Sequence, residues 1–214
     1  MCPVFSAAPL ATFGITPTAA QFEAIQAYIA LLLKWNRIAS LTGITEPREI
    51  LERHFGESFF AVGAVPIEKG RLADVGPGAG FPGAAIALLK PEVEVTLIEA
   101  NGKKAAFLQT VRRELGLKNL AVARTRVEEC REVLASADFV TARAFGSYDK
   151  LLRLLHNVGL RPTAKVVLWL GRNDAAELSR TRAWTWQAPI QIPGSERRVL
   201  LVGSADLSEP PGTS

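Results

Sequence analysis

The sequence predicts an α/β fold with a mainly parallel sheet, preceded by a helical extension at the N-terminus. Apolar residues recur at helical spacing before residue 65, and short strand patterns alternate with helical ones from about residue 70. A glycine-rich turn joins the first strand to the helix that follows it. The chain has 214 residues, of which 48% are hydrophobic and 21% charged, so we expect one globular domain with a sizeable core.

Residues 1–65 are expected to form an arm and a helical extension. The first fifteen residues show no hydrophobic period, which suggests a loose arm. Thr16-Pro17 is typical of a helix start, and the apolar spacing that follows predicts a long amphipathic helix over 18–38. A second helix is expected to open at Thr45, Pro47 and Glu49 and to run toward Val62.

Residues 66–205 are expected to form a Rossmann-like core of βαβ units. We predict strands at 71–75, 93–98, 120–123, 139–142 and 166–170. We predict helices at 82–89, at 102–115 with Asn101 as the cap, at 151–160 and near 173–180. The segments 184–192 and 197–202 are expected to pair as a hairpin, and 206–214 is expected to be a disordered tail.

Few residues in the chain suit disulfides or metal binding. Cys2 and Cys130 are the two cysteines, and His54 and His156 lie far apart in sequence. We therefore expect no metal and a cytoplasmic location. No apolar run approaches the roughly 20 residues of a membrane span, and no exposed heptad pattern argues for a dimer. A monomer that does not bind membranes is expected.

The net charge of +4 is distributed unevenly along the chain. Residues 101–131 carry eight basic and three acidic side chains, and residues 151–198 carry the same numbers. The first hundred residues carry seven basic and ten acidic side chains. Two basic segments indicate a cationic face and favour a phosphate-rich partner such as nucleic acid. Scattered solvated Lys and Arg are the simpler alternative.

The turn from Gly76 to Gly83 fits two classes of cofactor. Gly78, Gly80 and Gly83 satisfy the dinucleotide pattern, and Glu99 follows about 20 residues on, where a ribose-binding acid is expected. Read from Asp74, the same stretch has the Asp-x-Gly-x-Gly-x-Gly pattern of class I methyltransferases, which bind S-adenosylmethionine.

Electrostatics favour S-adenosylmethionine over a dinucleotide. A carboxylate at Asp74 would repel a pyrophosphate but attract the ammonium and sulfonium of the methyl donor. Glu99 can accept hydrogen bonds from ribose hydroxyls in either case, and Val127 and Glu128 are placed for an adenine edge. No Tyr-x-x-x-Lys motif of short-chain dehydrogenases is present. A nicotinamide-dependent reductase, and a glycine turn without any ligand, stay as alternatives.

Several motifs together resemble one family. They are Lys34-Trp-Asn36, Glu52-Arg-His-Phe55, Asp74–Gly83, Gly102–Leu108, Arg126-Val-Glu128 and Val140–Ala144. This combination is similar to the bacterial small-subunit ribosomal RNA 7-methylguanosine methyltransferases, also called the glucose-inhibited division protein B family, over roughly residues 20–205. The resemblance implies a class I methyltransferase fold that uses S-adenosylmethionine. It also implies methylation of N7 of one guanine in 16S rRNA, as naked RNA or within the 30S subunit.

The resemblance also assigns donor contacts, and four positions depart from the family pattern. The implied contacts are Gly76, Phe81, Val127, Glu128 and Arg143. Pro77 replaces a small polar residue, Glu57 stands where Asp is common, and Ser40 stands where Asn is usual. Leu170 occupies a position that is often Lys, so a basic residue expected near the substrate is missing, with Arg172 two residues further on.

N7 of guanine carries an accessible lone pair, so its methylation requires no general base. We therefore expect no catalytic residue beyond those that position the two substrates. The expected RNA contacts are Lys103, Lys104, Arg112, His54 and Arg172. For His54, simple packing is the alternative, and for Arg143 an ion pair with Asp149 is the alternative to a contact with donor carboxylate or phosphate. A non-catalytic RNA-binding or ribosome-assembly module that retains a donor pocket is the alternative function.

Overall fold

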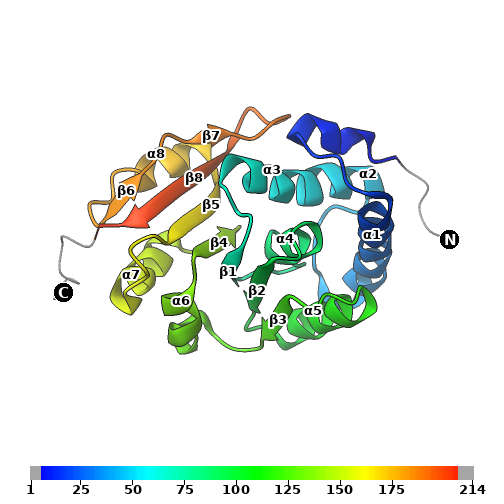
Figure 1. Ribbon diagram of the computed structural model, residues 1–214, viewed down its shortest axis with the longest axis horizontal. Coiled ribbons are helices and arrows are strands. Elements are labelled where there is room, and N and C mark those ends of the chain that lie inside the picture. The colour runs from blue at the N-terminus through cyan, green and yellow to red at the C-terminus, as the bar shows by residue number, and fades with distance from the viewer. Residues whose placement is uncertain (1–5, 207–214) are drawn as a thin grey trace.

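An eight-stranded sheet runs through the molecule, with helices on both of its faces (Figure 1). The computed structural model describes residues 6–206, so the tail predicted at 206–214 lies outside the described residues from 207 onward. The strands are β1 (Gly70–Val75), β2 (Val93–Ile98), β3 (Leu120–Ala123), β4 (Phe139–Arg143), β5 (Lys165–Gly171), β6 (Trp184–Trp186), β7 (Ile190–Gln191) and β8 (Arg198–Ala205). Their order is β3-β2-β1-β4-β5-β8-β6, and β7 also pairs with β8.

Strands β1 to β5 are mutually parallel, and β8 is antiparallel to its three neighbours. The predicted mainly parallel sheet is confirmed. The final hairpin is only partly as predicted, because 184–192 forms two short strands instead of one. The register slips by one residue between Trp186↔Gly203 and Ile190↔Leu200. Pro189, which lies between β6 and β7, has no N–H to contribute to a strand ladder.

Two hydrophobic clusters, one on each face, join the helices to the sheet. The first cluster holds α1 (Ala19–Ala39), α2 (Pro47–Ile50), a π-helical segment (Leu51–Gly56), α3 (Glu57–Ala64), α4 (Gly83–Leu89) and α5 (Gly102–Glu114). The second holds α6 (Arg131–Ser136), α7 (Tyr148–Val158) and α8 (Arg172–Leu178). The N-terminal extension therefore packs on the same face of the sheet as α4 and α5.

The start of the extension differs from the sequence prediction in two ways. Residues Ala8–Phe13 form a 3-10 helix whose Leu10 side chain is fully buried, so the prediction of a loose arm is wrong there. Helix α1 begins at Ala19 and not at Thr16-Pro17, because Thr18 and Gln21 form a capping box. The Thr18 hydroxyl accepts from the Gln21 N–H, and the Gln21 side-chain oxygen accepts from the Thr18 N–H.

The predicted helix over 45–62 is also more complex than its apolar pattern suggested. Glu46, not Thr45, caps its start, and one π-helical turn separates α2 from α3. Such turns are frequent at functional sites because they change the direction in which side chains project. The prediction also missed α6 and the 3-10 turn Val127–Glu129, which lack a clear apolar period.

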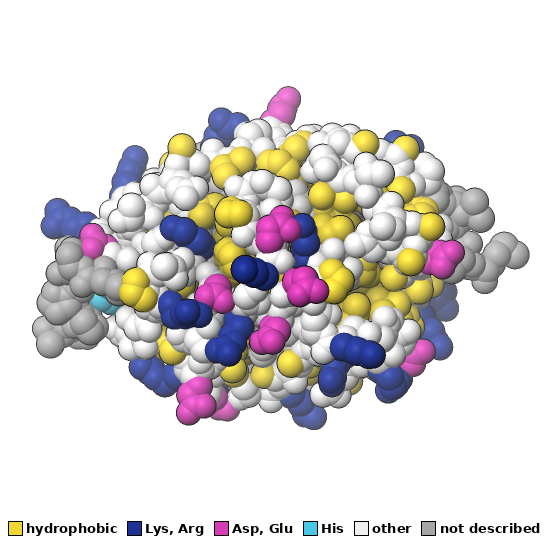
Figure 2. All heavy atoms as spheres, viewed as in Figure 1, with side chains coloured by type: hydrophobic (Ala, Val, Ile, Leu, Met, Phe, Trp, Pro, Cys, Tyr) yellow, Lys and Arg dark blue, Asp and Glu magenta, His cyan; other side chains and the backbone are white. Residues whose placement is uncertain are grey.

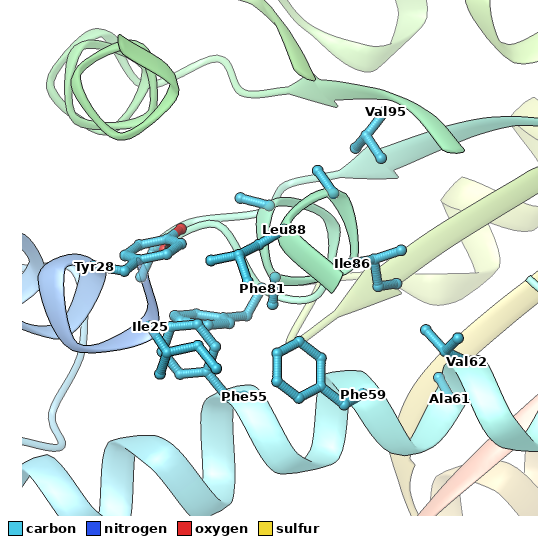
Figure 3. Packing of buried hydrophobic residues seen from close by; sticks show 14 of the residues in the cluster. Ile25, Tyr28, Phe55, Phe59, Ala61, Val62, Phe81, Ile86, Leu88 and Val95 are labelled. Atoms are coloured by element: carbon cyan, nitrogen blue, oxygen red, sulfur yellow. Dashed lines mark hydrogen bonds between the residues drawn. The ribbon is translucent and has the colours of Figure 1, made fainter. Parts of the chain in front are cut away.

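Aromatic side chains attach the extension to the glycine turn of the core. Phe81 stacks on Tyr28 of α1 with ring centroids 5.5 Å apart, and meets Phe55 edge-on at 4.9 Å. Figure 3 shows Phe81 lying between the side chains of α1 and those of the π-helical segment. Aromatic pairs in such geometries contribute about 0.5–1.5 kcal/mol beyond the area they bury. The extension thus helps to shape the loop that follows β1.

Candidate active site

The site lies at the carboxyl edge of the parallel strands. Helices α4 and α5 follow β1 and β2 on one face of the sheet, whereas α7 follows β4 on the other face. Ligands of open α/β sheets bind where the connections diverge in this way. The donor-binding residues predicted from sequence all lie at or just beyond this edge: Asp74, Gly76, Gly78, Gly80, Phe81, Glu99, Val127, Glu128 and Arg143.

Asp74 supports the glycine loop from inside the fold. Its side chain is fully buried, one carboxyl oxygen accepts the Gly83 N–H at 2.6 Å, and the other accepts the Thr141 hydroxyl at 2.9 Å. Burial raises the pKa of Asp74 to about 7, while the two hydrogen bonds act in the opposite direction. Direct contact between Asp74 and a ligand stays a prediction, since the structure gives this carboxyl a bracing role.

Glu99 holds the loop from the neighbouring strand. Its two carboxylate oxygens accept from the N–H groups of Gly78 at 3.2 Å and Asn101 at 2.8 Å. A carboxylate has about four acceptor positions, so Glu99 retains capacity for two ribose hydroxyls. A Cβ built on Gly78 would have no atom within 4 Å, so the space above this part of the loop is open to a ligand. These residues fit S-adenosylmethionine as a donor substrate.

Gly80 is the position where the loop and α1 approach most closely. Its φ of +92° lies in the left-handed region, and a Cβ there would overlap the Tyr28 hydroxyl. That hydroxyl donates to the Ala79 carbonyl oxygen at 2.8 Å. The sequence predicts Tyr28 only as part of the helix over 18–38, because a long-range hydrogen bond has no sequence signature.

The loop after β3 carries Val127 and Glu128, the residues predicted to contact the adenine. Val127 is partly buried and Glu128 exposed on the 3-10 turn that follows this strand. The exposed Arg124 side chain lies across the start of α5, where a Cβ on Gly102 would come within 2.8 Å of its guanidinium. Arg124 was not among the predicted site residues, although it lies at the end of β3.

A buried carboxylate joins two arginines on the other side of the site. Glu57, whose side chain is 2% exposed, contacts Arg143 at 3.1 Å and Arg198 at 2.7 Å. Arg143 also donates to the Arg53 carbonyl oxygen at 2.9 Å. Burial lowers the pKa of Arg143, and Glu57 opposes this shift. The predicted alternative of an Arg143–Asp149 pair is wrong, because the Arg143 guanidinium forms its ion pair with Glu57.

His54 belongs to the π-helical segment and packs against the glycine loop. Its ring stacks on Phe81 with centroids 4.8 Å apart, and Nε2 lies 2.8 Å from the Thr42 hydroxyl. Burial lowers the pKa of His54 to about 3, and Arg143 and Arg53 lower it further. Its Nδ1 is buried without a hydrogen-bond partner among residues 6–206. A neutral, packed imidazole accounts for these contacts, and an RNA contact by His54 stays a prediction.

The remaining predicted RNA contacts do not form one cluster. Lys103 and Lys104 lie at the start of α5, which begins at the carboxyl edge, whereas Arg112 lies roughly 13 Å further along this helix. Arg172 follows β5 at the carboxyl edge and donates to the Gln191 side chain. On the face seen in Figure 2, Lys and Arg are interspersed with Asp and Glu, so the predicted cationic face is not continuous there.

The departures from the family pattern have distinct surroundings. Leu170 is 4% exposed and belongs to the second hydrophobic cluster, so its side chain is not available for a substrate contact in this structure. The Pro77 carbonyl oxygen accepts from the N–H groups of Gly80 and Phe81. Ser40 ends α1 with a φ of +46°, a conformation that Asn adopts more readily than Ser.

The described residues contain neither a metal-binding cluster nor a membrane-spanning helix. Among residues 6–206 no group of His, Cys, Asp and Glu side chains could hold a metal ion. None of the helices in the same range is long and apolar enough to cross a membrane.

The fold and the glycine loop are those of a class I methyltransferase. Solved structures with related folds include the precorrin-6y C5,15-methyltransferase of Geobacter metallireducens, with a TM-score of 0.57, 12% identity, and coverage of 70% of this chain and 87% of that one. A variant of the protein called MtNAS, solved in complex with S-adenosylmethionine, gives a TM-score of 0.60 at 12% identity, with 87% and 76% of the two chains covered.

The chain belongs to the rRNA small subunit methyltransferase G family, also termed GidB, whose pattern matches residues 21–192. The Ribosomal RNA small subunit methyltransferase G of Xylella fastidiosa is 44% identical over 170 residues, which cover 78% of each chain. The protein of the same name from Xanthomonas axonopodis is 37% identical over 181 residues, or 82% of this chain and 83% of the relative. The family resemblance seen in the sequence is confirmed.

Proposed function

We propose that the protein transfers the methyl group of S-adenosylmethionine to N7 of a specific guanine in 16S rRNA. The observation that carries the donor assignment is the pairing of the loop with carboxyl groups. Gly78 N–H donates to Glu99, and Gly83 N–H donates to Asp74. These are the donors that a pyrophosphate would need, so the loop is suited to a positively charged ligand and not to a dinucleotide.

The donor would lie along the carboxyl edge from the glycine loop to the turn after β3. The loop from Gly76 to Phe81 would hold the methionine part, Glu99 the ribose hydroxyls, and Val127 with Glu128 the adenine. Arg143 borders the acceptor side of this edge, where it is fixed by Glu57 and the Arg53 carbonyl. We propose that the N-terminal extension acts as part of this site, since Tyr28 and Phe55 fix the loop.

The reaction requires positioning and no proton transfer. The N7 lone pair forms the new C–N bond as the S–CH₃ bond breaks, which leaves neutral S-adenosylhomocysteine and a positive charge on the methylated base. Holding N7 in line with the methyl group is therefore the main task of the protein. The neutral His54 and the arginine-bound Glu57 are consistent with a site that has no general base.

The rRNA of the small subunit, alone or in the 30S particle, is the proposed partner, and the bacterial cytoplasm is the proposed location. We also propose a monomer, supported by Ile38 being the one large hydrophobic side chain that is strongly exposed among the described residues.

Nucleoside mass spectrometry of 16S rRNA tests the proposal. Unmethylated 30S subunits are incubated with the protein and S-adenosylmethionine, and a new 7-methylguanosine is the expected product. A different methylated nucleoside would keep the donor and overturn the acceptor atom. Donor binding without methylation of any nucleoside would favour the non-catalytic RNA-binding module.

A further inference from the structure

A cleft of about 600 Å³ lies beside the donor site, between the N-terminal 3-10 helix, α2 with the π-helical segment, and the turn before β8. The charged residues of its lining are Arg48, Glu52, Arg53, Glu57 and Arg198. Arg198, the first residue of β8, lies opposite Gly171, the last residue of β5, in the antiparallel pairing of these strands. The cleft therefore opens at the carboxyl edge of the sheet. It is therefore at the same end of the sheet as the donor site, but on the β5 side.

Positive charge exceeds negative charge around this cleft. Arg48 pairs with Glu52 at 2.9 Å, and Arg53 pairs with Glu49 at 3.0 Å. Glu57 is the one carboxylate that forms ion pairs with both Arg143 and Arg198. These three ion-paired groups around the cleft and the two pairs above therefore contain four guanidinium groups and three carboxylates. Excess cationic charge in a partly buried cleft favours binding of an anion.

The guanidinium groups also have unused hydrogen-bonding capacity. The Nε atoms of Arg53 and Arg198 are buried and have no hydrogen-bond partner within the described part of the chain. The Arg48 side chain is 70% exposed, so it can turn from Glu52 toward a ligand at little cost. Guanidinium groups bind phosphate oxygens in a bidentate manner, which suits several arginines around one anion.

We propose that this cleft binds a phosphate of the RNA strand next to the target guanine. The inference rests on the proposed function, because that function supplies RNA at the carboxyl edge. The donor occupies the edge over β1, β2 and β3, so the acceptor strand approaches from the side of β4 and β5. An RNA backbone phosphate in the cleft would lie across Glu57 from Arg143 and would fix the register of the strand.

Salt-dependent binding to unmethylated 30S subunits tests this contact. Arg48→Gln and Arg53→Gln are each expected to weaken binding about tenfold at low salt. Each is also expected to reduce by about 1 the slope of log Kd against log salt concentration. Affinity for S-adenosylmethionine is expected to stay at the wild-type value. Glu52→Gln is expected to act in the opposite direction, because it frees Arg48 for the RNA.

Arg161→Gln is the matched control. Arg161 is half-exposed and pairs with Asp138 at 2.7 Å, at the opposite edge of the sheet. The Arg161→Gln variant removes the same charge as the two cleft variants. Its affinity for 30S subunits and its salt slope should both stay close to wild type. Wild-type slopes for both Arg48→Gln and Arg53→Gln, with folding intact by circular dichroism, would overturn the proposed phosphate site.

Failure of the two proposals is distinguishable. If wild-type protein binds 30S subunits but methylates no guanine, the proposed function fails, and the binding slopes still decide whether the cleft contacts phosphate. Methylation with unchanged slopes in the arginine variants would retain the function and remove the cleft from the RNA interface.

Discussion

The two halves of the carboxyl edge carry opposite charges. On the donor side, Asp74 and Glu99 accept hydrogen bonds from backbone N–H groups, and no arginine pairs with either of them among the described ion pairs. On the acceptor side, Glu57 is shared between Arg143 and Arg198, and positive charge is in excess. The first arrangement suits a sulfonium and an ammonium, and the second suits a polyanion.

The halves also differ in what holds them in place. The glycine loop depends on close approach of backbone and aromatic rings, with Gly80 against Tyr28 and Phe81 against Phe55. The arginine side depends on a buried ion-pair network. Packing of this kind tolerates little change in volume, whereas an ion-pair network tolerates little change in charge. Substitutions that change one property at a time therefore separate the two halves.

The largest expected effect is on the acceptor side. Glu57→Gln leaves Arg143 without its counter-ion in a buried position, so the free energy of unfolding should fall by about 3–5 kcal/mol. Urea denaturation followed by circular dichroism measures this change. Glu52→Gln, which breaks an exposed pair, should cost less than about 1 kcal/mol. Equal losses for the two variants would contradict the distinction between the buried network and the surface pairs.

On the donor side, Gly80→Ala should be the most damaging single change in volume. The added methyl overlaps the Tyr28 hydroxyl at a positive φ, and we expect a loss of about 2–3 kcal/mol in unfolding free energy with weakened donor binding. Gly78→Ala has a positive φ but open space around it, so it should cost only about 1 kcal/mol.

A double variant sharpens this prediction. Tyr28→Phe alone removes the hydrogen bond to Ala79 and should cost about 1 kcal/mol. Combined with Gly80→Ala it makes room for the methyl, so the double variant should be more stable than the sum of the single effects predicts. Strict additivity in urea denaturation would mean that the Tyr28 hydroxyl is not what restricts Gly80.

The pH dependence of stability should have opposite signs for Asp74 and His54. The pKa of Asp74 is raised from 3.8 to about 7, so the folded state holds its proton more tightly than the unfolded state. Its contribution is present below about pH 4 and is lost as the pH rises through 7. Asp74→Asn should therefore remove a decrease in stability between these pH values.

His54 behaves in the reverse way. Its pKa is lowered from 6.5 to about 3, so its contribution is present above pH 6.5 and is lost as the pH falls toward 3. His54→Gln should remove this loss. Urea titrations of wild type and both variants at several pH values measure the two slopes separately, and slopes of the same sign would refute the assignment.

Much of the fold could be predicted because local signals agreed with one another. The strands β2 and β3 have the predicted bounds, and α5 begins after its Asn101 cap as expected. Elements whose conformation depends on tertiary contacts could not be predicted from the local sequence pattern. The 3-10 helix at Ala8–Phe13 has no period of its own and is ordered by burial of Leu10, and the π-helical segment reads as ordinary helix.

By itself, the sequence determined the fold class and the family, and it favoured S-adenosylmethionine as the methyl donor. Glycines, a strand-end acid and alternating elements are local features, and the charge of the acid favoured S-adenosylmethionine where the spacing also fitted a dinucleotide. Only the tertiary structure decided that Asp74 faces inward, that Glu57 and not Asp149 binds Arg143, and that Arg198 closes a cleft beside the site. Glu57 and Arg198 are far apart in the chain, and their charges interact only because β8 returns antiparallel beside β5 and brings Arg198 to the carboxyl edge.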